Sequence, residues 1–215
     1  MPILPATSAP PPEACLLAAL EALADGRIVG IPTDTVYGLA ADPFRPGATE
    51  RLFDAKRRSR DVDLPVLVAT IEQAMSLTTA VPAIASTLMQ RFWPGPLTLV
   101  LPRHPDLIAD LGEDEATIGV RCPAHPVPLA LCAKGGPLAT TSANLHGEPT
   151  SETAEEVVAV FGEAVAVVLD GGRRAGSPST VVDCTGAEPR LLREGRIPWS
   201  DVVGAAFTHD DFGVE

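Results

Sequence analysis

The sequence is poor in aromatic residues and in cations. Aromatic residues make up 4% of the 215 residues, so a folded core has to be built mainly from valine, leucine, isoleucine and alanine. Lysine and arginine number 16 against 28 aspartates and glutamates, which gives a formal net charge of -12. This acidity argues against non-specific nucleic-acid binding over the whole surface, because a phosphate backbone requires a broad basic face. A single basic cleft is compatible with it.

Targeting and membrane segments are also lacking. No apolar run approaches the roughly 20 residues that span a bilayer, and residues 1–12 lack the basic start and apolar stretch of a signal peptide. The four cysteines show no CxxC pair and no Cys/His metal spacing, which predicts buried free thiols in a reducing compartment. We therefore expect a cytoplasmic protein without a membrane segment, and a mobile proline-rich N-terminal arm over residues 1–12.

Several catalytic motifs are missing. The sequence contains no GxxxxGK[ST] phosphate loop, no GxGxxG after a strand, no HExxH and no GxSxG. The four histidines are scattered next to Pro or Gly or in the C-terminal tail, and we leave them out of the catalytic set. No protein metal site and no nucleophile with a paired base are predicted.

Predicted strands and helices alternate along most of the chain. The expected helices are 13–24, 49–56, 71–77, 81–92, 127–133, 151–161 with Ser151 as N-cap, and 198–206. The expected strands are 27–32, 64–70, 97–101, 116–120, 137–141, 165–169, 179–184 and 190–193. We expect a loop over 33–41, a mobile Gly- and Arg-rich link over 170–178, and an acidic C-terminal tail over 208–215. Because no linker divides residues 13–207, the pattern predicts one α/β domain with a mixed sheet.

A basic cluster follows the predicted helix 49–56. It consists of Lys56, Arg57, Arg58 and Arg60. Cations close together on an acidic chain indicate a local anion site, and phosphate is the most common such anion. The alternative is a solvated helix C-terminus, where positive charge complements the helix dipole. The residues by themselves leave both interpretations open.

Hydroxyl and cationic side chains recur where predicted strands or helices end. This set comprises Thr35, Lys56, Arg58, Arg121, Thr140, Ser142, Asn144, Ser179 and Arg193. In open α/β sheets, ligands gather beyond the carboxyl ends of strands. Such a set could hold a polyphosphate next to a small zwitterion, with catalysis by positioning and charge stabilisation. The alternative is that these residues are ordinary capping groups in loops.

Seven motifs occur in a specific order along the chain: PTDTVYGLAAD, AKRRSR, WPGPLTLVL, TIGVRCP, TTSAN, STVVD and LLREG. Together they resemble the threonylcarbamoyl-AMP synthase (YrdC-like) family, over residues 13–197. The K-x-R pair in the second motif and the S-x-N pair in the fifth mark the family.

The resemblance implies an enzyme that makes threonylcarbamoyl-AMP and pyrophosphate from L-threonine, bicarbonate and ATP. ATP would be used together with Mg²⁺. The product would feed threonylcarbamoyladenosine modification of tRNA, through a downstream tRNA-modifying transferase complex, and weak tRNA binding at the cavity is expected. The family fold is a twisted mixed α/β sheet with flanking helices around a concave basic cavity.

The resemblance also implies roles for single residues. The threonine-binding residues would be Thr35, Arg121 for the carboxylate, Thr140 and Ser179. The catalytic residues, which would also face the ATP phosphates, would be Lys56 and Arg58. Further ATP-binding residues would be Thr117, Ser142, Asn144, Thr150 and Arg193.

The chain departs from the family pattern at a few positions. Ser59 stands where family members usually have proline, Asp61, Val62 and Asp63 replace a segment that often contains Asn-Pro, and His146 replaces a common serine. A side-chain contact with ATP would be missing or shifted there. Two alternatives stay open: a non-catalytic nucleotide- or RNA-binding YrdC-like module, and a carbamoyl-transfer enzyme, although nothing resembles the additional modules of the latter.

Overall fold

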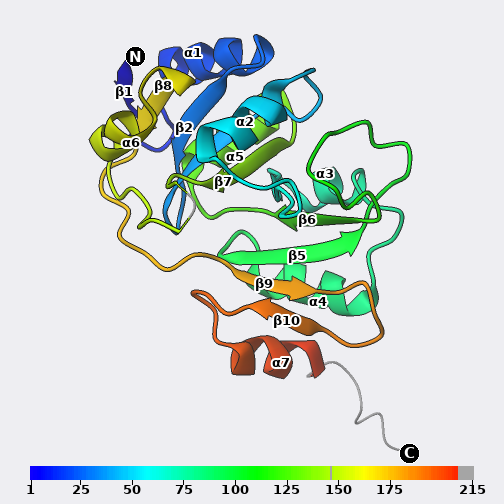
Figure 1. The fold of residues 1–215 in the computed structure, drawn as a ribbon. Helices are drawn as coiled ribbons and strands as arrows, with labels where there is room; N and C mark the ends of the chain where they lie inside the picture. The colour runs from blue at the N-terminus through cyan, green and yellow to red at the C-terminus, as the bar shows by residue number, and fades with distance from the viewer. Residues whose placement is uncertain (146, 208–215) are drawn as a thin grey trace, which may run out of the picture.

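The protein is built on one twisted, ten-stranded mixed sheet with helices on both faces (Figure 1). The computed structural model describes residues 1–145 and 147–207. The strands are β1 (Ile3–Pro5), β2 (Ile28–Pro32), β3 (Tyr37–Ala41), β4 (Val66–Leu67), β5 (Leu97–Pro102), β6 (Thr117–Arg121), β7 (Leu138–Ser142), β8 (Val165–Asp170), β9 (Thr180–Asp183) and β10 (Arg190–Arg193). The helices are α1 (Glu13–Ala24), α2 (Ala48–Lys56), α3 (Ile71–Met75), α4 (Ala83–Phe92), α5 (Pro126–Gly135), α6 (Ala154–Phe161), the short 3₁₀ helix η1 (Gly162–Ala164) and α7 (Trp199–Phe207).

The strand order in the sheet is β1-β8-β2-β3-β7-β4-β6-β5-β9-β10. Strands β2 and β8 are parallel, whereas β2 and β3 form an antiparallel hairpin in which Pro32 lies opposite Tyr37. Strand β5 pairs antiparallel with β6 and parallel with β9. The sheet is therefore mixed, and the predicted α/β class is confirmed. Figure 1 shows the twist: β2 runs steeply through the upper half, while β5, β6 and β9 cross the lower half.

Alternate side chains of the strands feed two separate hydrophobic clusters. In β2, Val29 and Ile31 join the cluster that contains Leu16 of α1 and Leu131 of α5, whereas Ile28 belongs to the cluster with Leu52 of α2. This division follows from the period of two in a strand, which sends successive side chains to opposite faces. Helices and hydrophobic side chains thus cover both faces of the sheet.

Several predicted boundaries are wrong. Residues 1–12 were expected to be a mobile arm, but Ile3–Pro5 pairs in parallel with β8, and the amide of Ala6 donates to the carbonyl of Asp170 at 2.7 Å. The open edge of β8 provides the hydrogen bonds that hold this segment. The expected loop over 33–41 contains strand β3, and the expected strand over 64–70 is reduced to β4.

Two other segments also differ from the expectations. Helix α6 begins at Ala154 and not at 151, because the hydroxyl of Thr153 caps it by accepting from the amide of Glu156. The link over 170–178 is held at its start, since the hydroxyl of Tyr37 accepts from the amide of Gly171 and donates to the carbonyl of Gly172. The acidic tail predicted over 208–215 and the departure at His146 lie outside the described residues.

The four cysteines are free and buried, as expected. Burial raises the pKa of Cys122 to about 11 and that of Cys132 to about 12, so both thiols stay protonated near neutral pH. Within 1–145 and 147–207, the helices are too short or too polar to cross a membrane.

Candidate active site

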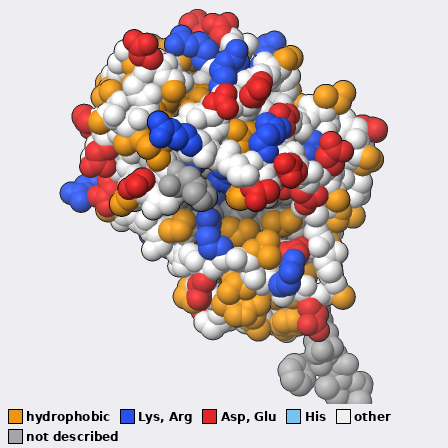
Figure 2. Space-filling model, viewed as in Figure 1, with side chains coloured by type: hydrophobic (Ala, Val, Ile, Leu, Met, Phe, Trp, Pro, Cys, Tyr) orange, Lys and Arg blue, Asp and Glu red, His pale blue; other side chains and the backbone are white. Residues whose placement is uncertain are grey.

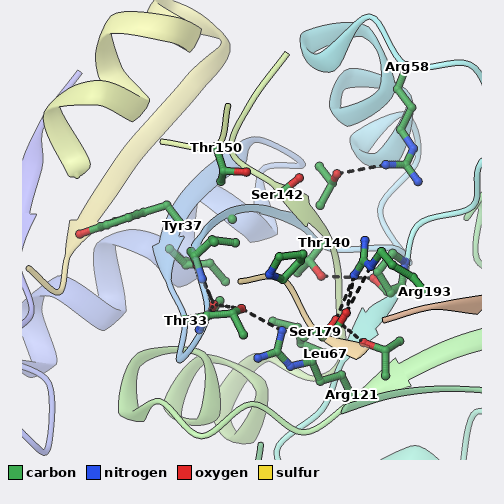
Figure 3. A pocket seen from close by; sticks show the side chains of 18 residues that line it. Thr33, Tyr37, Arg58, Leu67, Arg121, Thr140, Ser142, Thr150, Ser179 and Arg193 are labelled. Carbon is green, nitrogen blue, oxygen red and sulfur yellow. Dashed lines mark hydrogen bonds between the residues drawn. The ribbon is translucent and has the colours of Figure 1, made fainter. Parts of the chain in front are cut away.

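A cavity lined by polar and apolar side chains opens beside the tip of the β2–β3 hairpin, the end of β6 at Arg121, and strand β7. Its volume is about 240 Å³. Eight of the predicted site residues line it: Thr35, Arg58, Arg121, Thr140, Ser142, Thr150, Ser179 and Arg193. Figure 3 shows Arg121 at one end near Thr33, Arg58 at the opposite end, and Arg193 with Ser179 between them. Residues that are more than 150 positions apart in sequence, such as Thr35 and Arg193, therefore meet at one site.

The first end of the cavity is organised around Arg121. Its Nη1 donates to Thr35 Oγ1 at 3.2 Å, its Nε to the carbonyl of Gly95 at 3.0 Å, and its Nη2 to Asp34 Oδ1 at 2.7 Å. Burial lowers the pKa of the Arg121 guanidinium, and the carboxylate of Asp34 opposes that shift. The cation stays charged because the unperturbed pKa of arginine is so high.

A chain of hydroxyl groups orients the hairpin tip. Thr33 Oγ1 donates to the carbonyl of Val36 at 2.6 Å, and it lies 3.0 Å from Thr35 Oγ1. Since the Thr33 proton is used, the Thr35 hydroxyl donates to Thr33 and accepts from Arg121. The lone pair that remains on Thr35 can accept a hydrogen bond from an amine in the cavity.

Two further arginines line the cavity, Arg58 at the opposite end and Arg193 between Arg58 and Arg121. Arg58 is fixed by three contacts: Nε donates to the carbonyl of Val62, Nη2 to that of Asp63, and Nη1 to Thr141 Oγ1. Arg193 donates from Nε and Nη2 to the carbonyl of Ser179. Burial and, more weakly, the charge of Arg193 lower the pKa of Arg58. Two cations held in place next to hydroxyl groups form a site suited to phosphate.

The segment after the K-x-R pair, which differs from the family pattern at residues 61–63, holds Arg58 in this position. The carbonyls of Val62 and Asp63 accept from Arg58 at 2.8 and 3.0 Å. The Asp63 carboxylate accepts from the amide of Asp114 at 3.3 Å, which fixes the loop to a neighbouring segment. Two backbone carbonyls of this segment thus orient Arg58, and the Asp63 side chain anchors the segment.

Lys56 lies outside the cavity lining, beneath the S-x-N loop. The residue is 2% exposed. Its ammonium donates to the carbonyls of Ser142 and Asn144 at 2.6 and 2.7 Å, and to Asn144 Oδ1 at 3.1 Å. Three acceptors match the three N–H donors of an ammonium group. Lys56 therefore fixes the loop that carries Ser142 to helix α2, and its predicted contact with the phosphates stays a prediction.

The burial of Lys56 yields a prediction about its titration. Burial, together with the charge of Arg58, lowers the pKa of Lys56 to about 8 from 10.5. Between pH 8 and pH 10.5, Lys56 is protonated in the unfolded chain but largely neutral in the folded protein. The contribution of Lys56 to the free energy of unfolding therefore rises as pH increases over this range. Below pH 8 the buried charge opposes folding in full.

NMR of ¹³C-labelled lysine tests this directly, because Lys56 and Lys134 are the only lysines in the sequence. The Lys134→Arg variant leaves one lysine signal, which identifies the signal of Lys56. We expect this signal to titrate near pH 8. A Lys56 signal that titrates above pH 10 would contradict the burial of this ammonium group.

The other members of the basic cluster divide between different roles. Arg57 is exposed and ends α2 in the left-handed region with φ 50. Arg60 pairs with Asp110 and lies over the ring of Phe53. Of the four cations, Arg58 lines the cavity, which agrees with an anion site. Arg57 agrees with the alternative, a solvated cation at the helix C-terminus.

Two other predicted residues are not brought to the lining. Thr117 begins β6, at the other end of the strand from Arg121, and its hydroxyl donates to Asp114 Oδ2 at 2.5 Å. Asn144 shapes the loop: Oδ1 accepts from Ser142 and from Lys56, and Nδ2 donates to the carbonyls of Leu145 and Glu148. The predicted nucleotide contacts of both residues stay predictions.

Some residues of the site were not predicted. Thr33 and Tyr37 line the cavity, and Thr98 lies 2.9 Å from Ser179 through their hydroxyl groups. Thr33 and Tyr37 belong to the motif PTDTVYGLAAD, from which only Thr35 was selected. The position directly after a buried strand was the available signal for Thr33.

The surface around the site mixes charges of both signs. Figure 2 shows blue lysine and arginine side chains bordering a hollow between the upper and lower halves of the molecule, with red acidic side chains interspersed over the same face. Positive and negative side chains are thus interspersed on this face, and they form no broad basic surface there.

Comparison with known proteins assigns the family. A sequence model of the Sua5/YciO/YrdC family, described as telomere recombination, matches residues 21–195. The chain belongs to the Sua5/YciO/YrdC family. The family assignment predicted from the seven motifs is thus confirmed.

Relatives in the Sua5/YciO/YrdC family match along most of this chain. A Bacillus subtilis protein named threonylcarbamoyl-AMP synthase is 41% identical over 189 residues, which cover 86% of this chain and 54% of the relative. An Escherichia coli protein of the same name is 38% identical over 186 residues, covering 84% of this chain and 95% of the relative. The structure of Pyrococcus abyssi Sua5 complexed with L-threonine superposes with a TM-score of 0.89 and 35% identity, over 95% of this chain and 61% of that one.

Proposed function

We propose that this protein is a threonylcarbamoyl-AMP synthase, which forms threonylcarbamoyl-AMP and pyrophosphate from L-threonine, bicarbonate and ATP. The observation that carries the proposal is one cavity with two chemically different ends. Arg121 and Thr35 lie at one end, Arg58 lies at the other, and Arg193 lies between Arg121 and Arg58. The first suits an amino acid and the second suits a polyphosphate.

The Arg121 end is proposed to bind L-threonine. A guanidinium group matches the planar geometry of a carboxylate in a bidentate contact. Thr35, Thr140 and Ser179 would bind the amine and hydroxyl of the amino acid. The homologous P. abyssi structure, with L-threonine bound, supports this use of the fold.

The arginine-rich end is proposed to bind the triphosphate of ATP. Arg58 would contact the phosphates directly and stabilise charge on the leaving pyrophosphate, with Arg193 next to it. Ser142 and Thr150 line the cavity at this end, where the nucleotide would extend. Lys56 would act from beneath the loop of Ser142 and Asn144, through its charge and through the position it imposes on the loop.

The first chemical step is carbamate formation. The neutral amine of threonine adds to the carbon of bicarbonate, a C–N bond forms, and water leaves. The Arg121 contact would hold the carboxylate away from the phosphates and aim the amine along the cavity toward Arg58. Bringing the two reactants together in one cavity lowers the entropic part of the barrier.

The second step transfers the adenylate. A carbamate oxygen attacks the α-phosphorus, the bond to the bridging oxygen breaks, and pyrophosphate leaves with the electron pair. Charge builds up on the leaving phosphates, near Arg58 and Arg193. Fixed positive groups of this kind need no reorganisation during the reaction.

Mg²⁺ is proposed to enter bound to the ATP phosphates. Within 1–145 and 147–207 no group of three His, Cys, Asp or Glu side chains is arranged to hold a metal ion. Mg²⁺ commonly keeps several water ligands and binds through substrate phosphates. When bound, the ion would supply additional neutralisation of phosphate charge.

The product is proposed to be consumed by a tRNA-modifying transferase complex that acts on adenosine in tRNA. The four buried, free thiols agree with a reducing compartment such as the cytoplasm. Weak tRNA binding at the cavity stays a prediction.

A product assay tests the proposal. Purified protein is incubated with ATP, Mg²⁺, bicarbonate and L-threonine, and the mixture is separated by HPLC and analysed by mass spectrometry. An adenylate whose formation requires both threonine and bicarbonate, with release of pyrophosphate, is expected. ATP binding without any adenylate would contradict the proposal and favour a non-catalytic nucleotide-binding module.

A further inference from the structure

A buried carboxylate lies directly behind Arg121. Asp34 Oδ1 is 2.7 Å from Arg121 Nη2, and the two side chains are 11% and 8% exposed. Asp34 does not belong to the cavity lining, whereas Arg121 does. Asp34 Oδ2 is buried and has no hydrogen-bond partner among the described residues. A buried carboxylate oxygen without a hydrogen-bond partner is unfavourable, so its retention requires a structural or functional reason.

The contacts of Arg121 indicate what this carboxylate does. A guanidinium group has five N–H donors. Three of the Arg121 donors are used, by the carbonyl of Gly95, the hydroxyl of Thr35 and the carboxylate of Asp34. The two that remain belong to Nη1 and Nη2, and both can donate to a ligand carboxylate. The protein thus uses one donor on each nitrogen of the guanidinium and leaves one donor on Nη1 and one on Nη2 for a ligand.

The backbone of Asp34 is also held in place. Its carbonyl accepts from Arg196 Nη1 at 2.7 Å, and the amide of Arg196 donates to the carbonyl of Pro178. Asp34 is therefore tied to the segment after β10 as well as to β6. Each contact limits how far the hairpin tip, and Thr35 with it, can move.

We propose that Asp34 is a positioning residue for amino-acid binding: it orients the Arg121 guanidinium so that the two free donors face the substrate carboxylate. The inference rests on the proposed function, because it assumes that the Arg121 end binds threonine. The negative charge of Asp34 also stabilises the buried cation of Arg121, and a neutral side chain would stabilise that cation less. Affinity for the ligand then depends on the geometry of two hydrogen bonds rather than on net positive charge in the cavity.

The experiment compares Asp34→Ala, Asp34→Asn and the parent protein. Dissociation constants for L-threonine and for ATP are measured by calorimetry, and KM and kcat are measured by pyrophosphate release. For Asp34→Ala we expect the dissociation constant and KM of threonine to rise at least about tenfold, since a charged hydrogen bond that orients the cation is lost. The affinity for ATP and kcat at saturating threonine should change less than about threefold, within the range of indirect effects.

Asp34→Asn provides the conservative rescue. Its carboxamide oxygen can still accept from Arg121 Nη2, so threonine affinity should lie between those of the parent and of Asp34→Ala. The matched control is Asp183→Asn, which removes a carboxylate paired with Arg190 on β9 and β10 at 2.8 Å. We expect this control to leave threonine affinity as in the parent.

Three outcomes separate the claims. If the parent binds threonine and forms the adenylate but both Asp34 variants bind threonine like the parent, Asp34 has no positioning role and the inference fails alone. Equal losses of threonine and ATP affinity would show a general structural role and would also overturn it. A parent protein that binds no threonine would overturn the proposed function itself.

Discussion

Replacing Lys56 with methionine is expected to lower turnover about 100-fold, with much less effect on threonine affinity. Methionine retains an unbranched apolar stem but leaves the carbonyls of Ser142 and Asn144, and Asn144 Oδ1, without their donor. Losing even two hydrogen bonds from a charged donor costs about 3 kcal/mol, which corresponds to a factor of about 100. The loss should fall on the loop that lines the nucleotide end of the cavity.

The measurement for Lys56→Met is steady-state pyrophosphate release together with calorimetry for each substrate. Lys134→Met is the matched control, because it removes the other lysine of the sequence, in the last turn of α5. Turnover equal to the parent would remove Lys56 from the chemistry. A loss of threonine affinity as large as that of turnover would show that the loop also supports the amino-acid end.

Replacing Arg121 with lysine is expected to raise the dissociation constant of L-threonine about 10- to 100-fold. Lysine keeps a positive charge next to Asp34, but an ammonium cannot hold Gly95, Thr35, Asp34 and a bidentate ligand at the same time. Each hydrogen bond to a charged group is worth about 1.5–3 kcal/mol, which gives the stated range.

The affinity for ATP should be unchanged by Arg121→Lys, because the proposed phosphate contacts lie at the other end of the cavity. Arg190→Lys is the matched control, because it makes the same substitution in an ion pair whose arginine side chain is 73% exposed. We expect it to leave the affinities for threonine and ATP as in the parent. Threonine binding of Arg121→Lys at the level of the parent would show that the carboxylate is bound elsewhere.

The α/β class was predictable because most strands are short apolar runs between helical patterns, as in β8 and β5. Strand β3 was missed for a physical reason. Its sequence, YGLAA, contains glycine and alanines that rarely favour strands. At Gly38 a Cβ atom would lie 3.1 Å from the carbonyl of Thr141, so the close approach of β7 favours glycine there.

The short β1 was missed because its pairing depends on the free edge of β8, which only the tertiary fold creates. A three-residue segment among prolines carries no periodic pattern of its own. Strand β4 was predicted but with bounds that are too long, and its two residues pair with β6 and β7.

The candidate site was predictable where a motif carries its own chemistry, as with Arg121 and the hydroxyl groups of Thr140 and Ser142. It was not predictable where a role depends on a distant partner. Lys56 reads as part of an exposed basic cluster, yet contacts with a loop 86 residues later bury it. The sequence assigns no role to Asp34, and only the position of Arg121 reveals its ion pair.

The central claim is that one cavity holds threonine at the Arg121 end and the triphosphate at the Arg58 end. A crystal structure with L-threonine and a non-hydrolysable ATP analogue tests it most directly. We expect the threonine carboxylate within hydrogen-bonding distance of both free donors of Arg121, its amine turned toward the α-phosphate, and the triphosphate next to Arg58 and Arg193. Threonine bound away from Arg121, or a triphosphate that contacts neither arginine, would contradict the account.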